Sequence, residues 1–114
     1  MVSENKKILG IVNELLSNSL HAGGKEINIT ISKDLDSTRI MVEDNGRGMD
    51  EETLKDVKRT LNQPKRKDMQ SYYDGLVGHS SYGSGLNLVG LLSSESQVES
   101  SEEGTKITIK RYLK

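Results

Sequence analysis

The sequence predicts one α+β domain, built as a two-layer α/β sandwich with helices on one face of a mixed, mostly antiparallel sheet. Apolar residues recur at helical spacing near the N-terminus, and two later segments alternate strictly between apolar and polar residues. The chain has 114 residues, which is enough for one core and not for two. Because helices and sheet each have one apolar side, stacking them in two layers buries both sides.

The first predicted helix spans about residues 5–22. Its apolar positions are Ile8, Ile11, Val12, Leu15, Leu16 and Ala22, a spacing typical of one buried side. Next to that side, Glu14, Asn18 and His21 share one edge of the helix. Such a triplet is usually a solvated polar face. If the edge faces a pocket instead, the Asn18 amide can bind a hard cation and the Glu14 carboxylate can orient water.

The next segments predict an antiparallel hairpin. Residues 25–33 alternate cleanly, and a polar turn at 34–37 leads into a second strand that ends at Asp44. The isoleucines expected on the buried face of the first strand are Ile27, Ile29 and Ile31.

A short motif follows the second strand and reads Asp44-Asn45-Gly46-Arg47-Gly48-Met49. Asp44 has the same parity as Ile40 and Val42, so its carboxylate points to the buried face, where it needs a donor. Gly46 and Gly48 let the backbone bend and let a ligand come close. An inward acid beside a glycine turn suggests a pocket that binds a donor such as the amino group of a purine. The alternative is an ordinary Asx-turn after a strand.

The second half of the chain is less regular. A second helix is predicted at 51–61 and a third at 86–92, followed by a marginal strand around Val98 and a closing strand at 105–112. The connection at 62–84 is long for a small domain. It contains the basic run Lys65-Arg66-Lys67 and several glycines, which indicates either a lid over a pocket or a solvated surface loop. Its end, Gly83-Ser84-Gly85, opens a predicted helix and could bind an anion.

Composition narrows the class of protein. The 16 basic and 17 acidic residues give a formal net charge of −1, so no electrostatic argument favours nucleic acid or an anionic membrane. The chain has no cysteine, which excludes disulfides and thiolate metal sites. No apolar run approaches the length of a spanning helix or a secretory signal. We therefore expect a cytoplasmic protein without a membrane or nucleic-acid partner.

Taken together, four motifs resemble the GHKL, or Bergerat, family of ATP-binding domains, shared by DNA gyrase, the ninety-kilodalton heat-shock chaperone, histidine kinases and MutL. The motifs are Glu14 to Ala22, Asp44 to Met49, Gly83-Ser84-Gly85-Leu86-Asn87-Leu88, and Gly104-Thr105. They occur in the family's order, lie on predicted elements and cover most of the chain. The resemblance implies one ATP-binding domain over residues 1–114, with 62–84 as its ATP lid.

The resemblance also implies roles for the base and ribose. Asp44 would accept from the adenine amino group, and Thr105 would join it around the base through water. Gly46 and Gly48 would let base and ribose approach, and Met49 would belong to the same cofactor-binding motif.

For the phosphates, the resemblance implies magnesium. Asn18 would ligate Mg²⁺ with its amide oxygen, and Glu14 would orient or deprotonate the attacking group. The backbone amides implied to contact phosphate are those of Gly83, Ser84, Gly85 and Leu86. One of Lys65, Arg66 or Lys67 would reach the γ-phosphate.

Two departures leave the reaction open. Many histidine kinases have Asn at the position of Glu14, whereas the anti-sigma serine kinases keep a Glu there. The Gly83-Ser84-Gly85-Leu86 motif looks more like that of the kinases than like that of gyrase or MutL. His21 stands where MutL-like members have Asp. Since the sequence shows no helical hairpin with a phosphoacceptor histidine, we expect an ATP-dependent protein kinase or ATPase that acts on a partner in trans, with a homodimer also open. The alternative is a nucleotide-gated protein-binding module with little catalysis.

Overall fold

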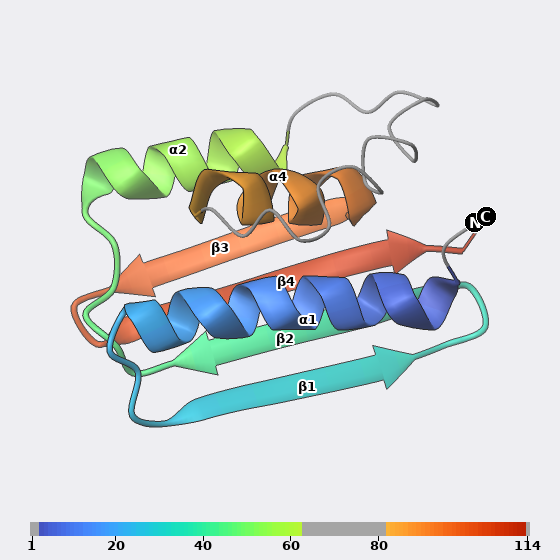
Figure 1. The fold of residues 1–114 in the computed structure, drawn as a ribbon, viewed down its shortest axis with the longest axis horizontal. Helices are drawn as coiled ribbons and strands as arrows, with labels where there is room; N and C mark the ends of the chain where they lie inside the picture. The colour runs from blue at the N-terminus through green and yellow to red at the C-terminus, as the bar shows by residue number, and fades with distance from the viewer. Residues whose placement is uncertain (1–2, 63–81, 114) are drawn as a thin grey trace.

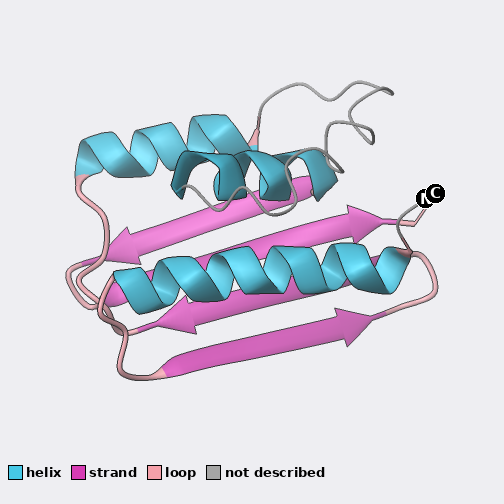
Figure 2. Ribbon diagram, in the orientation of Figure 1, coloured by secondary structure: helices cyan, strands magenta, loops and turns pink. Residues whose placement is uncertain are grey.

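The computed structural model describes residues 3–62 and 82–113, which form a sheet with helices on one face (Figure 1, Figure 2). The helices are α1 (Glu4–His21), α2 (Glu51–Leu61) and α4 (Tyr82–Leu92), and the strands are β1 (Ile27–Lys33), β2 (Ser37–Asp44), β3 (Glu95–Ser101) and β4 (Gly104–Tyr112). The strand order is β1-β2-β4-β3. The predicted α+β sandwich is confirmed, and every neighbouring pair in the described sheet is antiparallel, rather than mixed.

Local caps determine where two of the helices begin. The Ser3 hydroxyl accepts the Lys6 amide proton at 3.2 Å at the start of α1. The Asp50 carboxylate accepts the Thr53 amide proton at 2.7 Å at the start of α2, and this bond holds the pKa of Asp50 below its usual value. Each cap satisfies a helix donor that has no partner within the helix. Asp50 also terminates the glycine-containing loop that follows β2.

The core lies between the helices and the two central strands, β2 and β4. Its fully enclosed members are Ile11, Leu15, Ile40, Leu61, Val89 and Ile109. Ile40 and Ile109 lie directly opposite each other in the β2–β4 register. Because side chains alternate along a strand, the same face continues along β2 to Asp44, which is only 8% exposed. The core therefore ends at a carboxylate.

The prediction that Ile29 and Ile31 are buried is wrong. Their side chains are 39% and 45% exposed. They lie opposite Val42 and Ile40, so they point to the helix side of the sheet. However, β1 is an edge strand, and the helices lie over its neighbours (Figure 1). Alternation predicts the side of a strand that is apolar, and only the packing shows whether a helix covers it.

Helix α4 begins at Tyr82, four residues before the predicted start at Leu86. Gly83, Ser84 and Gly85 therefore form its first turn instead of a loop before it. Glycine is a poor helix former, and packing of α4 against α1 and α2 outweighs that preference. The rest of the predicted lid, at 63–81 with its basic run, lies outside the described residues. No helix in 3–62 or 82–113 is long and apolar enough to cross a membrane.

Candidate functional site

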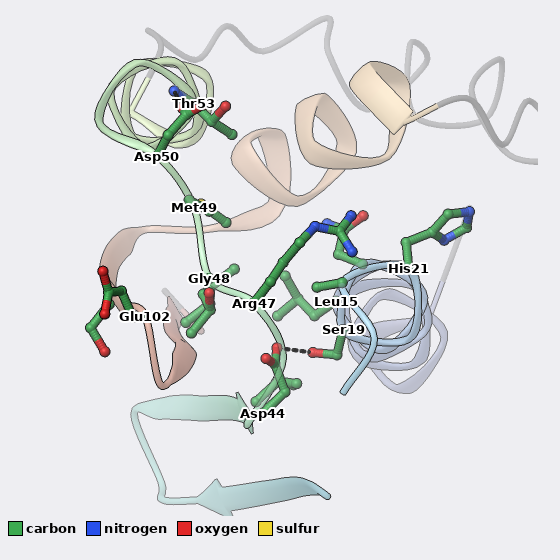
Figure 3. Close-up of a pocket in the computed structure, with 16 residues that line it drawn as sticks. Leu15, Ser19, His21, Asp44, Arg47, Gly48, Met49, Asp50, Thr53 and Glu102 are labelled. Atoms are coloured by element: carbon green, nitrogen blue, oxygen red, sulfur yellow. Dashed lines mark hydrogen bonds between the residues drawn. The ribbon is translucent and has the colours of Figure 1, made fainter. Parts of the chain in front are cut away.

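A cavity of about 800 Å³ opens beside the inward carboxylate of Asp44 (Figure 3). Its walls come from the C-terminal part of α1, the ends of β2 and β3, the loop after β2 and the start of β4. The lining residues include Leu15, Asn18, Ser19, His21, Val42, Asp44, Arg47, Gly48, Met49, Ser101, Glu102, Thr105 and Ile107. This volume is typical of a small-molecule site, and its walls combine apolar side chains with a few polar ones.

Asp44 is held by two donors at the mouth of the core. Its Oδ2 accepts the Ser19 hydroxyl at 2.6 Å, as Figure 3 shows, and its Oδ1 accepts the Gly46 amide proton at 2.8 Å. The Gly46 bond is the Asx-turn that the motif also predicted, so the turn and the inward acid are both present. Since each carboxylate oxygen has two lone pairs, Asp44 keeps acceptor capacity for a ligand.

Ser19 is a site residue that sequence reasoning missed. It is 4% exposed and lies on α1 at the spacing of the apolar residues Ile11 and Leu15. The sequence did carry a signal for Ser19, because a polar residue at a buried position of a helix needs a hydrogen-bond partner. Its partner, Asp44, lies 25 residues away in the sequence.

The loop after β2 is tied to the connection between α1 and β1. The Asn45 side-chain oxygen accepts the amide protons of Lys25 and Glu26, each at 2.9 Å. The Arg47 amide donates to the Ala22 carbonyl at 3.1 Å. These bonds hold Arg47 at the cavity, where its guanidinium supplies positive charge (Figure 3). Arg47 belongs to the motif quoted from the sequence but received no role there.

Gly46 and Gly48 lie against the protein's own backbone. A Cβ on Gly46 would lie 2.6 Å from the Ala22 carbonyl oxygen. Gly48 has a φ of +75°, and a Cβ there would overlap the Ser101 carbonyl. The two glycines therefore let the loop pack closely between α1 and the end of β3. Their predicted roles toward base and ribose stay predictions.

Thr105 lies opposite Asp44 in the β2–β4 register and is 8% exposed. Its Oγ1 is 2.9 Å from the Ser100 Oγ. The Ser100 Oγ also accepts the Met49 amide proton at 2.8 Å. Ser100 thus joins the end of β3 both to the loop and to Thr105, and the serine-rich sequence around it carried no signal of that role.

Apart from Gly46, which packs against the Ala22 backbone, the predicted site residues fall into two groups in the structure. Asn18, Asp44, Gly48, Met49 and Thr105 line the cavity.

The second group lies between α1 and α4. A Cβ on Gly85 would overlap the Glu14 carboxylate, so this side chain rests on the first turn of α4. The backbone of Gly83 and Ser84 lies in the same turn, while the Leu86 side chain is 4% exposed and belongs to the core.

Asn18 is suited to a magnesium ion that has few protein ligands. No cluster of three His, Asp or Glu side chains within the described parts of the chain could hold a metal. Mg²⁺ usually keeps several waters and binds phosphate oxygens together with one or two protein groups. The Asn18 amide oxygen, at the wall of a cavity large enough for a nucleotide, fits that pattern.

Comparisons with known proteins identify a matching family and solved structures of similar fold. The model of the family "Histidine kinase-, DNA gyrase B-, and HSP90-like ATPase" matches residues 7–113. No match was found among curated proteins. Among solved structures, 70 chains match. One is the histidine kinase domain from the Erythrobacter litoralis EL346 blue-light activated histidine kinase, with 23% identity and a TM-score of 0.56.

That structural match covers 93% of this chain and 46% of the solved chain, so this chain spans about half its length. At this identity the likeness shows a shared fold. The family match extends from α1 to the end of β4 and includes every residue that lines the cavity. The chain therefore belongs to the GHKL family of histidine kinase-, DNA gyrase B- and HSP90-like ATPases.

Proposed function

We propose that the cavity binds ATP with Mg²⁺ and that the chain transfers or hydrolyses the γ-phosphate, acting in trans as a histidine-kinase-like or serine-kinase-like protein. The observation that carries the proposal is the buried Asp44 carboxylate, held by Ser19 and Gly46 beside a nucleotide-sized cavity. Family membership supports nucleotide binding.

Asp44 supports a preference for adenine. An ionised carboxylate is an acceptor only, so it can bind the amino group of adenine but opposes the carbonyl oxygen of guanine. A site built to bind a donor rejects an analogue that presents an acceptor, because its own buried polar group is left unpaired.

Asn18 and the first turn of α4 support phosphate binding. The Asn18 amide oxygen would hold Mg²⁺, which when bound supplies positive charge to the phosphates. The amides of Gly83, Ser84 and Gly85 lie in that first turn, where the first backbone donors have no partner within the helix. The Leu86 amide comes four residues after Tyr82 and so donates within the helix, which leaves the three earlier amides as the candidates for phosphate. Phosphates that extend from the cavity toward α4 would meet both groups.

Glu14 distinguishes catalysis from binding alone. As the group that orients or deprotonates the attacking hydroxyl or water, it would support the kinase or ATPase reaction. Its carboxylate rests on Gly85 in this structure. That contact favours the second candidate, a nucleotide-gated protein-binding module in which ATP changes the contact between α1 and α4.

A protein partner supplied in trans, either a phosphoacceptor or a second copy, belongs to the proposal, as does a cytoplasmic location without nucleic acid or membrane. Partly exposed Ile29 and Ile31 on edge strand β1 support a protein contact, since unpaired edges with apolar side chains associate readily.

Nucleotide binding is tested by calorimetry with ATP and GTP in the presence of Mg²⁺. We expect ATP to bind at least about tenfold more tightly than GTP. Asp44→Asn should lose most of the ATP affinity, whereas the exposed Asp36→Asn should retain it. Equal affinity of the parent for ATP and GTP would exclude this pocket.

Chemistry is tested by comparing Asn18→Ala with Glu14→Ala. Asn18→Ala removes a metal ligand, so Mg²⁺-ATP affinity should fall. Glu14→Ala should keep or gain ATP affinity, because a negative charge is removed, while phosphate release or transfer falls by about a hundredfold or more. Both are measured with and without candidate acceptor proteins. If the parent shows no turnover in any mixture and Glu14→Ala changes nothing, the kinase or ATPase proposal is excluded. The nucleotide-gated module then remains.

A further inference from the structure

Strand β1 leaves one side of its backbone open at the edge of the described sheet (Figure 1). Just after β1, the Asp34 amide donates to the Ser37 carbonyl of β2 at 2.8 Å. In an antiparallel ladder, residues that bond to one neighbour alternate with residues whose N–H and C=O point the other way. The even-numbered residues of β1 therefore bond to β2, and the backbone groups of Ile29 and Ile31 point to the open edge.

The side of α1 that faces β1 is apolar. Lys33 Nζ donates to Asn5 Oδ1 at 3.2 Å, so Asn5 lies on the side of α1 toward β1. Leu9, Val12 and Leu16 follow Asn5 by four, seven and eleven residues, which places them on the same side of the helix. Leu9 is 64% exposed, and a groove of about 400 Å³ runs beside these three side chains. The β1–α1 surface consists of Leu9, Val12, Leu16, Ile29 and Ile31.

The two edges of the described sheet differ in charge. The edge strand β3 carries Glu95 and Glu99, and charged side chains on an edge oppose pairing with another chain. From Ile27 to Ser32, β1 has neither a charged residue nor a proline, and it is rich in β-branched side chains that favour strand pairing. Of these two edges, β1 is the one suited to accept a further strand.

The sequence of β1 is complementary to itself about Thr30, its middle residue. When two copies pair antiparallel about this residue, Ile29 of each copy lies opposite Ile31 of the other. On the opposite face, Asn28 lies opposite Ser32, so polar side chains also meet polar ones. Such self-complementarity is what a two-fold interface between identical chains requires. The formal net charge of −1 leaves little repulsion between two copies.

We propose that the β1–α1 surface is an interface between two copies of this chain, whose β1 strands pair to form one continuous sheet. The two β2 strands would then lie three strand spacings apart, about 14 Å. Because α1 packs on β2, the two α1 helices would face each other above the isoleucines of β1, with Leu9 and Leu16 between them.

This inference rests on the second copy that the proposed function includes, and it requires no nucleotide. None of the five residues of the β1–α1 surface lines the cavity beside Asp44. Pairing of two chains depends on concentration, so dilute protein leaves β1 uncovered.

Sedimentation equilibrium of the parent without nucleotide tests the interface. We expect the mass to rise with concentration toward twice the 12.6 kDa of one chain. The double variant Ile29→Lys/Ile31→Lys should dimerise at least about tenfold more weakly, because like charges would lie opposite each other. The double variant Ile29→Glu/Ile31→Glu should behave in the same way, and an equimolar mixture of the two should dimerise again. Leu35→Lys, at a 97% exposed position beyond the strand, is the control and should dimerise like the parent.

A disulfide assay keeps both isoleucines and decides the matter if the double variants do not fold. The chain has no cysteine, so Thr30→Cys introduces a single thiol. In the proposed pairing the two Thr30 Cα atoms lie about 4.5 Å apart, within the range of a disulfide, and oxidation should give covalent dimers. Ser32→Cys is the matched control on the same face of β1. Its two copies would lie about 14 Å apart, so this variant should stay without a crosslink.

The outcomes separate this interface from the ATP site. A parent that stays monomeric up to about 100 µM, or a Ile29→Lys/Ile31→Lys variant that dimerises like the parent, would overturn the interface and leave the ATP site standing. Equal crosslinking of Ser32→Cys and Thr30→Cys would overturn it as well. A parent that dimerises through this surface but binds no ATP would support the interface and overturn nucleotide binding.

Discussion

Glu14 and Gly85 meet where α1 faces the first turn of α4. A Cβ on Gly85 would overlap the Glu14 carboxylate, which is the far end of a flexible side chain. Gly90, five residues further along α4, faces something different. A Cβ there would lie 2.6 Å from the Thr60 carbonyl oxygen, a backbone atom of α2. Gly85 thus makes room for a movable acid, and Gly90 makes room for a rigid helix.

We predict that Gly85→Ala alters Glu14 without harming the fold. Alanine keeps the amide and improves helix propensity by up to about 1 kcal/mol, so the melting temperature should be equal or higher. The Glu14 carboxylate must move away, so turnover should fall about tenfold or more, measured by phosphate release or transfer.

Two controls accompany this prediction. Gly90→Ala should instead lower the melting temperature, because backbone cannot give way as a side chain can. In a Glu14→Ala background, Gly85→Ala should change turnover no further. Full turnover in Gly85→Ala would show that the position of Glu14 in this structure does not matter for the reaction.

At the scale of elements, the β1–β2 hairpin has two strands of similar pattern and different burial. Ile31 on β1 lies directly opposite Ile40 on β2, and both point to the helix side. Ile31 is 45% exposed and Ile40 is fully buried, because Ile40 lies under α1 and beside β4.

This pair makes a direct test of how far the helices cover the sheet. Ile40→Thr puts a hydroxyl into the core and should reduce the free energy of unfolding by about 2 kcal/mol or more. Ile31→Thr makes the same change on the edge strand, where threonine is well tolerated, and should cost less than about 1 kcal/mol. Urea unfolding of both variants measures the difference. Similar losses would mean that β1 is covered in solution.

At the scale of the whole molecule, Arg111 joins both ends of the described chain. Its guanidinium donates to both Glu4 carboxylate oxygens at 2.7 Å and also to the Leu92 carbonyl. One side chain thus connects the first turn of α1, the end of α4 and strand β4, and Figure 1 shows the start of α1 beside the end of β4. The paired donors match the two carboxylate oxygens, which makes this a geometrically specific ion pair.

Because of this ion pair, we expect the stability of the protein to depend on pH. The hydrogen bond from Arg111 lowers the pKa of Glu4 below its ordinary value of 4.5. A group with a lowered folded-state pKa contributes stability above its unfolded pKa, and that contribution is lost as the pH falls through the folded value. Glu4→Gln should therefore be less stable than the parent at pH 7, and the difference should shrink below about pH 4.5.

Thermal unfolding at neutral and acid pH measures this difference. Glu51→Gln, an exposed acid in the first turn of α2, is the control and should change stability much less. A Glu4→Gln deficit of the same size at both pH values would contradict the role of the ion pair.

Local chemistry explains what could be predicted of the site. The parity of Asp44 with Ile40 and Val42 correctly placed the acid inward, since parity depends on strand geometry alone. The cap at Asp50 and the spacing of α1 are equally local. Ser100 could not be found in this way, because its partners come from a loop 51 residues earlier and from the neighbouring strand.

By itself the sequence determined the order of helices and strands, the inward direction of Asp44 and the motifs shared with the family, because periodicity, caps and turns act over a few neighbouring residues. Only the tertiary structure decided which distant residues meet. Ser19 donates to Asp44, Ser100 is hydrogen-bonded to Thr105, and the Glu14 side chain packs on Gly85. It also decided that β1 stays largely uncovered. Spacing along the chain shows which side of an element is apolar, but its neighbours depend on how distant segments pack together.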